Sequence, residues 1–158
     1  MGQGFWVIAK NIVRNADVVL EVLDARFPNI TRIPRLEKQA KDKLIFIINK
    51  ADLVSETTLE KIENEYRNTN YALISASTSR NIGRLIKLIK SSSKGLKVAV
   101  IGYPNTGKSS LINRLSKGGK ARTSSESGFT KGMQLISGKA GIMLIDTPGI
   151  VPFEGRDE

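Results

Sequence analysis

The sequence contains no cysteine and no histidine. Without cysteine the chain forms neither disulfides nor thiolate metal sites, and it has no thiol nucleophile. Without histidine it lacks imidazole-based catalytic triads and the commonest side-chain ligand of transition metals. Any metal ion must therefore be a hard cation held by oxygen atoms.

Long apolar runs are missing as well. The longest are residues 18–20 with their neighbours and residues 44–48, far short of the roughly 20 residues that cross a bilayer. The apolar run at residues 5–9 is interrupted by Lys10 and Arg14, which is untypical of a signal peptide. The sequence predicts no membrane partner and a cytoplasmic location.

The composition of the chain is typical of one globular domain that spans residues 1–158. The chain has 158 residues, of which 40% are hydrophobic and 25% charged, enough apolar surface to bury a core. Lysine and arginine outnumber the acids by 25 to 15, so the net charge is +10. That charge indicates either a polyanionic partner such as nucleic acid or a well-solvated lysine-rich surface.

Nearly continuous apolar runs alternate with amphipathic segments along the chain, the habit of strands and helices in a parallel α/β sheet. Expected strands cover residues 18–23, 44–48, 71–74, 96–101, 134–137 and 142–145. Expected helices cover residues 5–15, 35–41, 82–89 and 110–115, and a further one that runs to residue 67 from an N-cap at Ser55 or Thr58. The alternation predicts a three-layer α/β sandwich around a mostly parallel sheet of about six strands.

A phosphate-binding pattern follows the fourth expected strand. Residues 102–109 read Gly-Tyr-Pro-Asn-Thr-Gly-Lys-Ser and fit G-x-x-x-x-G-K-[ST] between a strand and a helix. Backbone N–H groups of such a loop surround phosphates, the lysine neutralises the β and γ oxygens, and the serine hydroxyl binds Mg²⁺. The predicted phosphate-binding residues are Pro104, Asn105, Thr106, Gly107, Lys108, Ser109 and Ser110.

A second polar loop, Asp-Thr-Pro-Gly at residues 146–149, follows the last expected strand. The Asp146 carboxylate is suited to a Mg²⁺-bound water, and the Gly149 N–H is suited to a γ-phosphate. Taken alone, the segment also fits a capped turn.

A guanine pocket is indicated by Asn49-Lys50-Ala51-Asp52 after the second expected strand. The Asp52 carboxylate accepts two hydrogen bonds from the N1–H and the 2-amino group of guanine. Adenine has neither donor there, so its binding leaves a polar acceptor unpaired at a cost of about 1–3 kcal/mol.

These loops, together with Ser75-Ala76-Ser77, resemble the motif set of GTPases, but the order along the chain is changed. Here the N-K-x-D and S-A loops precede the phosphate loop and the D-T-P-G loop. This order, with Asp-Ala-Arg-Phe-Pro at residues 24–28, resembles the circularly permuted GTPases of the YlqF/YawG type, which are ribosome-assembly factors. The resemblance covers about residues 17–152 and implies a P-loop GTPase fold, since all these loops end strands at one sheet edge. We expect the join of the permuted halves at residues 91–95.

The resemblance implies roles for individual residues. Asn49 would contact the base edge and brace neighbouring loops, the Lys50 stem would pack on the base, and the Ala76 N–H would meet the guanine oxygen. Thr130 would join Ser109 and Asp146 around Mg²⁺ in the GTP state, with Thr123 as the rival candidate.

The implied catalytic set comprises Lys108, Thr130, Asn105 and Gly149. Ile150 stands where many GTPases place a water-orienting glutamine. Asn105 matches the asparagine that ligates K⁺ in potassium-stimulated GTPases, although a plain turn residue also fits there. The resemblance implies slow, K⁺-stimulated hydrolysis of GTP with Mg²⁺ as cofactor.

Expected partners are GTP or GDP and ribosomal RNA or the large ribosomal subunit, and we expect a monomer. Two basic regions are candidates for RNA contact: residues 80–97, and residues 117–131 with Lys117, Lys120, Arg122 and Lys131. The first also fits a solvated helix face. Arg26 is suited equally to RNA contact, to support of the site or to a pair with Asp24.

Two other functions remain open: a GTPase of another RNA process, such as tRNA modification, and a passive guanine-nucleotide or RNA-binding module. Members of the resembling family continue into a helical RNA-docking domain, whereas this chain ends nine residues after Gly149. The resemblance therefore implies an isolated G domain without that C-terminal domain.

Overall fold

Six strands form one sheet in the computed structural model of this chain, which describes residues 2–92, 95–118 and 134–146. Their order across the sheet is β3-β2-β1-β4-β6-β5. The strands are β1 (Val18–Asp24), β2 (Leu44–Asn49), β3 (Tyr71–Leu73), β4 (Lys97–Ile101), β5 (Gln134–Ser137) and β6 (Met143–Asp146). All neighbours pair in parallel except β5 and β6, which pair antiparallel. The predicted mostly parallel six-stranded sheet is confirmed.

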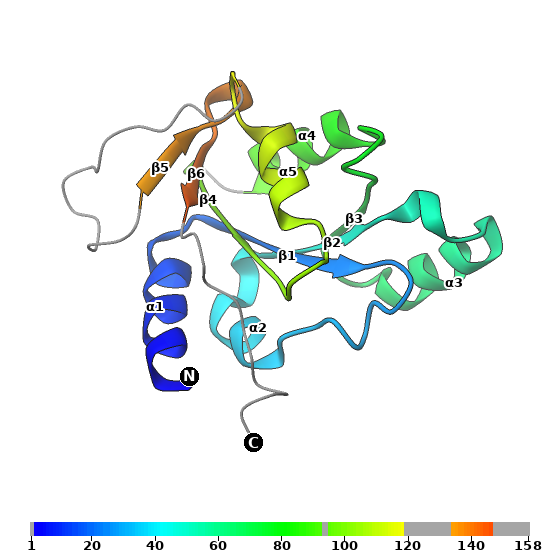
Figure 1. Ribbon diagram of the computed structural model, residues 1–158, viewed down its shortest axis with the longest axis horizontal. Helices are drawn as coiled ribbons and strands as arrows, with labels where there is room; N and C mark the ends of the chain where they lie inside the picture. The colour runs from blue at the N-terminus through cyan, green and yellow to red at the C-terminus, as the bar shows by residue number, and fades with distance from the viewer. Residues whose placement is uncertain (1, 93–94, 119–133, 147–158) are drawn as a thin grey trace.

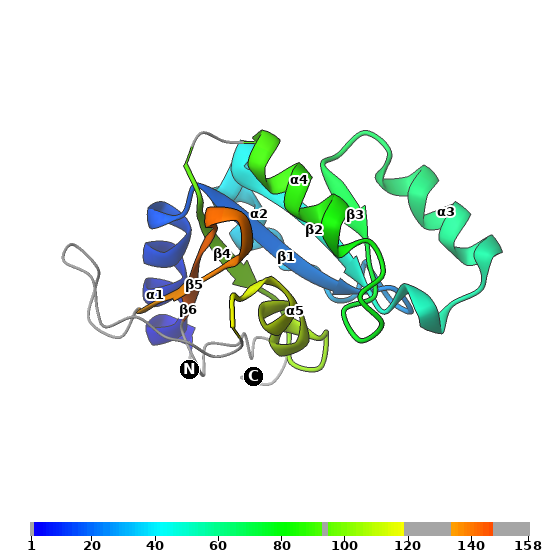
Figure 2. The ribbon, with the colours of Figure 1, turned by 90° about the horizontal axis from the view of Figure 1, so that it is seen from above.

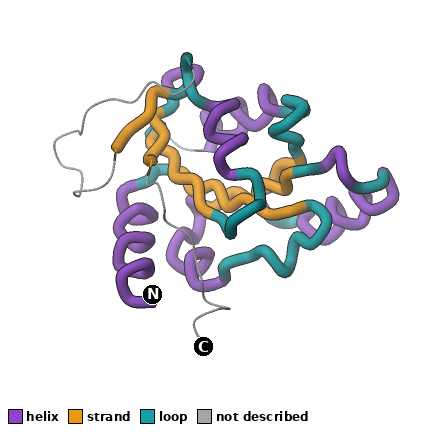
Figure 3. The backbone as a smooth tube through the Cα atoms, viewed as in Figure 1, coloured by secondary structure: helices purple, strands orange, loops and turns teal. Residues whose placement is uncertain are grey.

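Helices cover both faces of this sheet. They are α1 (Gly2–Asn15), α2 (Pro34–Ala40), α3 (Glu56–Tyr66), α4 (Ile82–Ser92) and α5 (Lys108–Leu115). Apolar residues of α4 and α5 pack on one face, and those of α1, α2 and α3 pack on the other. Figures 1 and 3 show the strands between the two helix layers, which is the expected three-layer sandwich.

The central strand β1 explains why its sequence reads as an apolar run. All seven of its residues are buried. Leu20 and Val22 face the α4–α5 layer, whereas Val19 and Leu23 face the opposite layer. Burial of each such side chain contributes about 1.5–3 kcal/mol, so a strand covered on both sides has few polar positions.

Several boundaries differ from the expectations. Helix α5 begins at Lys108 rather than at residue 110, and α1 begins at Gly2 rather than at residue 5. Helix α4 continues through Ser92 into the expected linker. Ser55 is the N-cap of α3, because its Oγ accepts from the Thr58 N–H at 3.1 Å.

The expected join between the permuted halves is fixed by Asp17. The Lys97 N–H donates to Asp17 Oδ2 at 2.9 Å, and the Asp17 N–H donates to the Lys97 carbonyl at 2.7 Å. A Cβ atom on Gly95 would collide with the same carboxylate, so a side chain there would displace Asp17 from this contact. Residues 93 and 94 lie outside the described part of the chain.

The predicted hairpin between the last two strands is confirmed, and a short 3₁₀ turn at Lys139–Gly141 connects them. Within the residues that the structure describes, no helix has both the length and the apolar character that crossing a bilayer requires.

Candidate nucleotide-binding site

Parallel pairing brings the predicted loops to one edge of the sheet. Asp24 ends β1 directly beside Asn49, which ends β2, and β4 ends at Ile101, level with Glu21. The phosphate loop follows β4, and the S-A loop follows β3. Carboxyl ends of neighbouring parallel strands form the usual ligand-binding crevice of open α/β sheets.

The phosphate loop depends on backbone that favours glycine. Gly107 has φ +99° at the N-cap of α5, where a Cβ would collide with the Asn49 amide. A Cβ on Gly102, with φ +157°, would lie 2.9 Å from the Val22 carbonyl. Asn105 also has a positive φ of 68°, which asparagine tolerates well. The loop is thus wrapped tightly around the start of α5.

The N-terminus of α5, where the phosphate loop ends, provides a positive electrostatic potential. Lys108 is the first helical residue, and Ser109 and Ser110 are exposed in the same turn. Burial lowers the pKa of the Lys108 ammonium, because desolvation penalises its charged form. A polyanionic ligand offsets that penalty, and the N–H groups of the first turn point toward it.

One buried amide connects three loops. Asn49 is 2% exposed. Its Nδ2 donates to the Thr106 carbonyl in the phosphate loop, and its Oδ1 accepts from the Ala76 N–H in the S-A loop, both at 2.9 Å. The bracing expected of Asn49 is therefore present. In this structure the Ala76 N–H donates to Asn49 Oδ1, and its expected contact with the guanine oxygen stays a prediction.

The carboxylate predicted to read guanine is oriented by the neighbouring loop. Ser75 Oγ donates to Asp52 Oδ1 at 2.7 Å and lies 3.4 Å from Ser77 Oγ. The Ala51 N–H donates to the Ile74 carbonyl at 3.0 Å, which anchors the N-K-x-D turn to the end of β3. Asp52 itself remains exposed.

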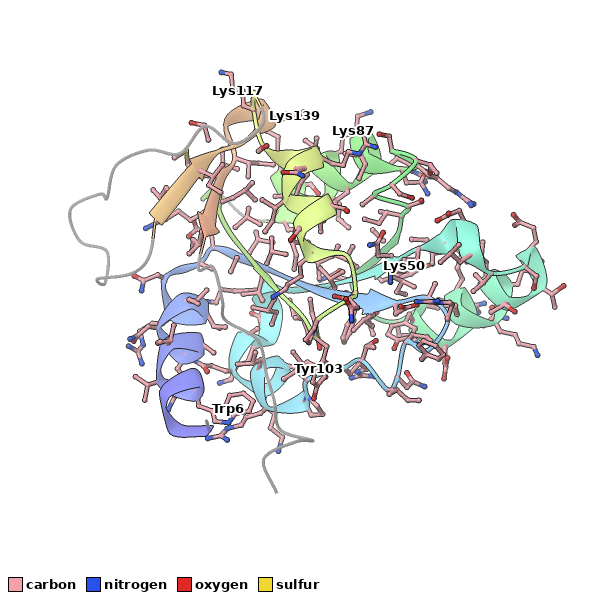
Figure 4. All side chains as sticks on the ribbon, in the orientation of Figure 1. Trp6, Lys50, Lys87, Tyr103, Lys117 and Lys139 are labelled. Carbon is pink, nitrogen blue, oxygen red and sulfur yellow. The ribbon has the colours of Figure 1, made fainter. Side chains whose placement is uncertain are left out.

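Asp24 ends β1 beside Asn49 and is the partner of Arg26, whose role the sequence left open. The Arg26 guanidinium forms two hydrogen bonds with it, at 3.0 and 2.8 Å, and the structure thus favours the Asp24 pair among the three alternatives for Arg26. Lys50 Nζ lies 3.2 Å from Asp24 Oδ2 and also donates to the Asn105 carbonyl. Figure 4 labels Lys50 at this edge. Burial opposes ionisation of Asp24, but the bonds from Arg26 and Lys50 prevail and lower its pKa to about 2.

A further contact between α5 and the S-A loop was not foreseen. Arg114 Nε donates to the Ala76 carbonyl at 2.6 Å, and its Nη2 donates to the Ser77 carbonyl at 2.8 Å. Two donors of one rigid guanidinium fix the loop against the helix that begins with the phosphate loop. The sequence offers only a basic residue in the last turn of a predicted helix, which is no distinctive signal.

Comparison with known proteins agrees with this geometry. Residues 97–158 match a family model described as 50S ribosome-binding GTPase. A GDP-bound structure of YlqF has a TM-score of 0.66 and 30% identity to this chain, over 90% of this chain and 57% of its own. YjeQ from Thermotoga maritima has a TM-score of 0.61 and 26% identity, over 87% of this chain and 49% of its own. This chain is a circularly permuted GTPase domain of the YlqF type.

Among curated relatives, an uncharacterised GTP-binding protein of Methanocaldococcus jannaschii is 42% identical over 96% of this chain. Nucleolar GTP-binding protein 2 of Yarrowia lipolytica is 36% identical over the same share. The GTPase domain described here spans 42% and 33% of the lengths of these two relatives.

The permuted order of the domain is visible in the sheet. The N-K-x-D and S-A loops follow β2 and β3, and these strands precede β6 and β4, which the phosphate loop follows. Strand β1 pairs with β4, so the two sets meet at the centre of the sheet. Chain order is changed, but the N-K-x-D, S-A and phosphate loops still lie at one edge.

Some expected residues of the GTPase domain lie outside the described part of the chain: Thr123, Thr130, Gly149 and Ile150, and the basic residues Lys120, Arg122 and Lys131. Asp146 is the last residue of β6, which runs parallel to β4 and ends at the same edge. Within the described ranges, no group of three or more acidic side chains that could hold a metal exists. The hydroxyl of Ser109, which is exposed in the first turn of α5, is of the oxygen type that ligates Mg²⁺.

Proposed function

We propose that this domain binds GTP and GDP, hydrolyses GTP slowly, and acts as a switch during assembly of the large ribosomal subunit. The observation that carries the proposal is the double hydrogen bond of Asn49. It unites the end of β2, the phosphate loop and the S-A loop in one rigid frame. A nucleotide held at this edge contacts base-reading and phosphate-binding loops simultaneously.

Guanine selectivity rests on Asp52. Its carboxylate is oriented by Ser75 and is exposed where the N-K-x-D turn ends. Two hydrogen bonds from the base to a carboxylate are charge-assisted and therefore stronger than neutral ones. Adenine cannot supply them, so the proposal requires a strong preference for guanine nucleotides.

Asp52→Asn tests this assignment. The amide presents a donor where the carboxylate accepts, so the variant should lose GDP affinity and gain affinity for xanthosine diphosphate, whose 2-position carries an oxygen. Each tenfold change corresponds to about 1.4 kcal/mol. Calorimetric titration with GDP, XDP and ADP measures the change, and Asp42→Asn, at an acidic residue outside the site, is the matched control. Retention of wild-type GDP selectivity by Asp52→Asn contradicts the base assignment.

Hydrolysis depends on charge stabilisation around the phosphates. We infer that Lys108 binds the β and γ oxygens, and that Ser109, Thr130 and Asp146 hold Mg²⁺, with the Gly149 N–H at the γ-phosphate. Mg²⁺, when bound, neutralises charge that develops on the phosphate oxygens. The aliphatic Ile150 cannot orient a water molecule, so the intrinsic rate is low.

We propose that Asn105, which is exposed in the phosphate loop, would ligate K⁺. A monovalent cation held there would supply positive charge next to the phosphates, as an arginine finger does in other GTPases. GTP turnover is expected to be faster in KCl than in NaCl of equal ionic strength, and Asn105→Ala should abolish the difference. Equal rates in both salts refute the cation role.

The ribosomal role is supported by the 50S ribosome-binding description of the matching family and by the names of nucleolar relatives. Turnover with and without large ribosomal subunits, beside pull-down of ribosomal RNA and tRNA, tests it. Acceleration by tRNA alone would favour a tRNA-modification GTPase. A cytoplasmic location and a monomeric state stay predictions.

A further inference from the structure

A charged groove runs along the free edge of the sheet at β3. Its volume is about 860 Å³, and its floor includes Tyr71, Ala72 and Leu73 of β3. Strand β3 is the outermost strand on that side and pairs only with β2. Helices α3 and α4, from opposite faces of the sheet, form the two walls. Figure 2 shows β3 between them.

The two walls carry opposite charges. Three glutamates from α3 and three basic residues at or before α4 line the groove: Glu56, Glu60, Glu63, Arg80, Arg84 and Lys87. All six are exposed. In the described part of the chain no ion pair connects the two walls. Figure 4 shows Lys87 on the α4 side.

The floor of the groove presents backbone groups that are not used inside the sheet. The Phe46 N–H donates to the Asn70 carbonyl and the Ile74 N–H donates to the Ile48 carbonyl, both at 2.9 Å. In a parallel ladder alternate residues of a strand bond to one neighbour, so Asn70, Ala72 and Ile74 bond to β2. The main chains of Tyr71 and Leu73 therefore face the groove.

Among the residues that the structure describes, only one of these outward groups has a hydrogen-bond partner. Asn81 Nδ2 donates to the Leu73 carbonyl at 2.8 Å and closes the end of the edge toward the S-A loop. The N–H and carbonyl of Tyr71 and the N–H of Leu73 remain available to a further strand.

We propose that this groove binds an extended peptide segment of a partner protein, which adds a strand beside β3 and has alternating basic and acidic side chains. Successive side chains of a strand point to opposite faces of a sheet. Those that point to the α3 face meet Glu56, Glu60 and Glu63, and those that point to the α4 face meet Arg84 and Lys87. Because side chains alternate between the two faces, a peptide that fits both walls has basic and acidic residues in alternation.

Other occupants fit less well. An RNA strand carries charge of one sign only, so the basic wall attracts it but the wall of three glutamates repels it. A second copy that paired antiparallel through β3 would be related by a two-fold axis perpendicular to the sheet. That symmetry places α3 against α3 and α4 against α4, so like charges face each other. A single peptide strand avoids both conflicts, because it brings no helix layers of its own.

The proposal concerns residues outside the nucleotide loops, so it stands apart from the GTPase assignment. A fluorescent peptide of alternating lysine and glutamate, titrated against the 158-residue chain, should bind. A peptide of equal composition, with all lysines before all glutamates, should bind about tenfold more weakly, a difference within the range of a few charge pairs. Equal affinity of the two peptides overturns the proposal. An RNA oligonucleotide that binds when neither peptide does overturns it as well.

Variants test the two walls separately. Glu60→Lys with Glu63→Lys, or Arg84→Glu with Lys87→Glu, makes both walls alike in charge and should reduce binding of the alternating peptide about tenfold or more. Lys61→Glu and Lys90→Glu, on exposed positions of α3 and α4 that do not line the groove, are the controls. Thermal unfolding of each variant verifies the fold. Unchanged peptide affinity in a folded wall variant contradicts the proposal.

Backbone pairing is tested on the peptide, where the protein stays intact. Alternate residues of a strand direct their N–H groups to opposite edges. N-methylation of all lysines blocks one edge of the peptide, and N-methylation of all glutamates blocks the other. One of the two peptides should lose binding while the other retains it. An equal effect of both modifications refutes strand addition.

Discussion

Removal of the Asn49 amide separates the roles of the three loops that it connects. Asn49→Ala deletes the donor to the Thr106 carbonyl and the acceptor of the Ala76 N–H, both bonds of 2.9 Å at a residue 2% exposed. Each buried group left without a partner costs about 1–3 kcal/mol. The two together amount to about 2–5 kcal/mol, since water enters part of the space.

That cost appears in two measurements. For a domain of this size, each kcal/mol shifts Tm by about 2–4 °C, so the Tm of Asn49→Ala should fall by about 5–15 °C. GDP affinity should fall by at least about tenfold, because nucleotide must now order the phosphate and S-A loops on binding. Calorimetric titration and thermal unfolding measure the two effects.

A second variant and a control sharpen the test. Asn49→Asp retains an acceptor for the Ala76 N–H but places a carboxylate oxygen against the Thr106 carbonyl, so it should weaken GDP binding at least as much as alanine does. Asn113→Ala, at an exposed asparagine of α5, should behave as wild type. Wild-type Tm and GDP affinity in Asn49→Ala would show that the amide does not hold the loops together.

Two further predictions concern other parts of the frame. Arg114→Ala removes both donors to the S-A loop and should lower GDP affinity about tenfold with a small change of Tm. Arg114→Lys should restore only part of the GDP affinity, because an ammonium lacks the two-pronged geometry of a guanidinium. Equal GDP affinities of the wild type and both variants in calorimetric titration would exclude this role. Burial, and after it the neighbouring Glu37, raises the pKa of Glu21 well above its ordinary value, so the folded state retains a proton that the unfolded chain releases near pH 4.3. The free energy of unfolding of the wild type should therefore fall as pH rises above about 5, and Glu21→Gln, which keeps the acceptor for the Ile33 N–H, should flatten that decline in urea titrations at several pH values.

Local signals were enough to predict most of the fold. The apolar runs of β1 and β2 and the cap at Ser55 depend on residues adjacent in the chain, and all three are confirmed. The start of α5 was placed two residues late, because Lys108 and Ser109 read as part of the phosphate loop although they already form its first turn. Proline at the first position of α2 similarly extends that helix to residue 34.

Contacts between distant elements were beyond sequence reasoning. The sequence pointed to Asp52 through the hydrogen-bond donors of guanine and to Asn49 through the resemblance to permuted GTPases, and both roles stay predictions. Nothing local shows that Arg114 reaches the S-A loop 37 or 38 residues earlier in the chain, or that the ammonium of Lys50 reaches the carbonyl of Asn105. These contacts depend on the register in which β1, β2 and β4 pair, and the sequence alone does not show that register.

The seam between β1 and β4 has a consequence for biosynthesis. In the proposed function, residues 1–92 contain the base-reading loops, and a ribosome releases them before β4 and the phosphate loop. The proposed nucleotide site is therefore incomplete until β4 has paired with β1. A bound nucleotide would contact loops on both sides of the β1–β4 pair, so its binding stabilises only the chain in which β4 has paired with β1.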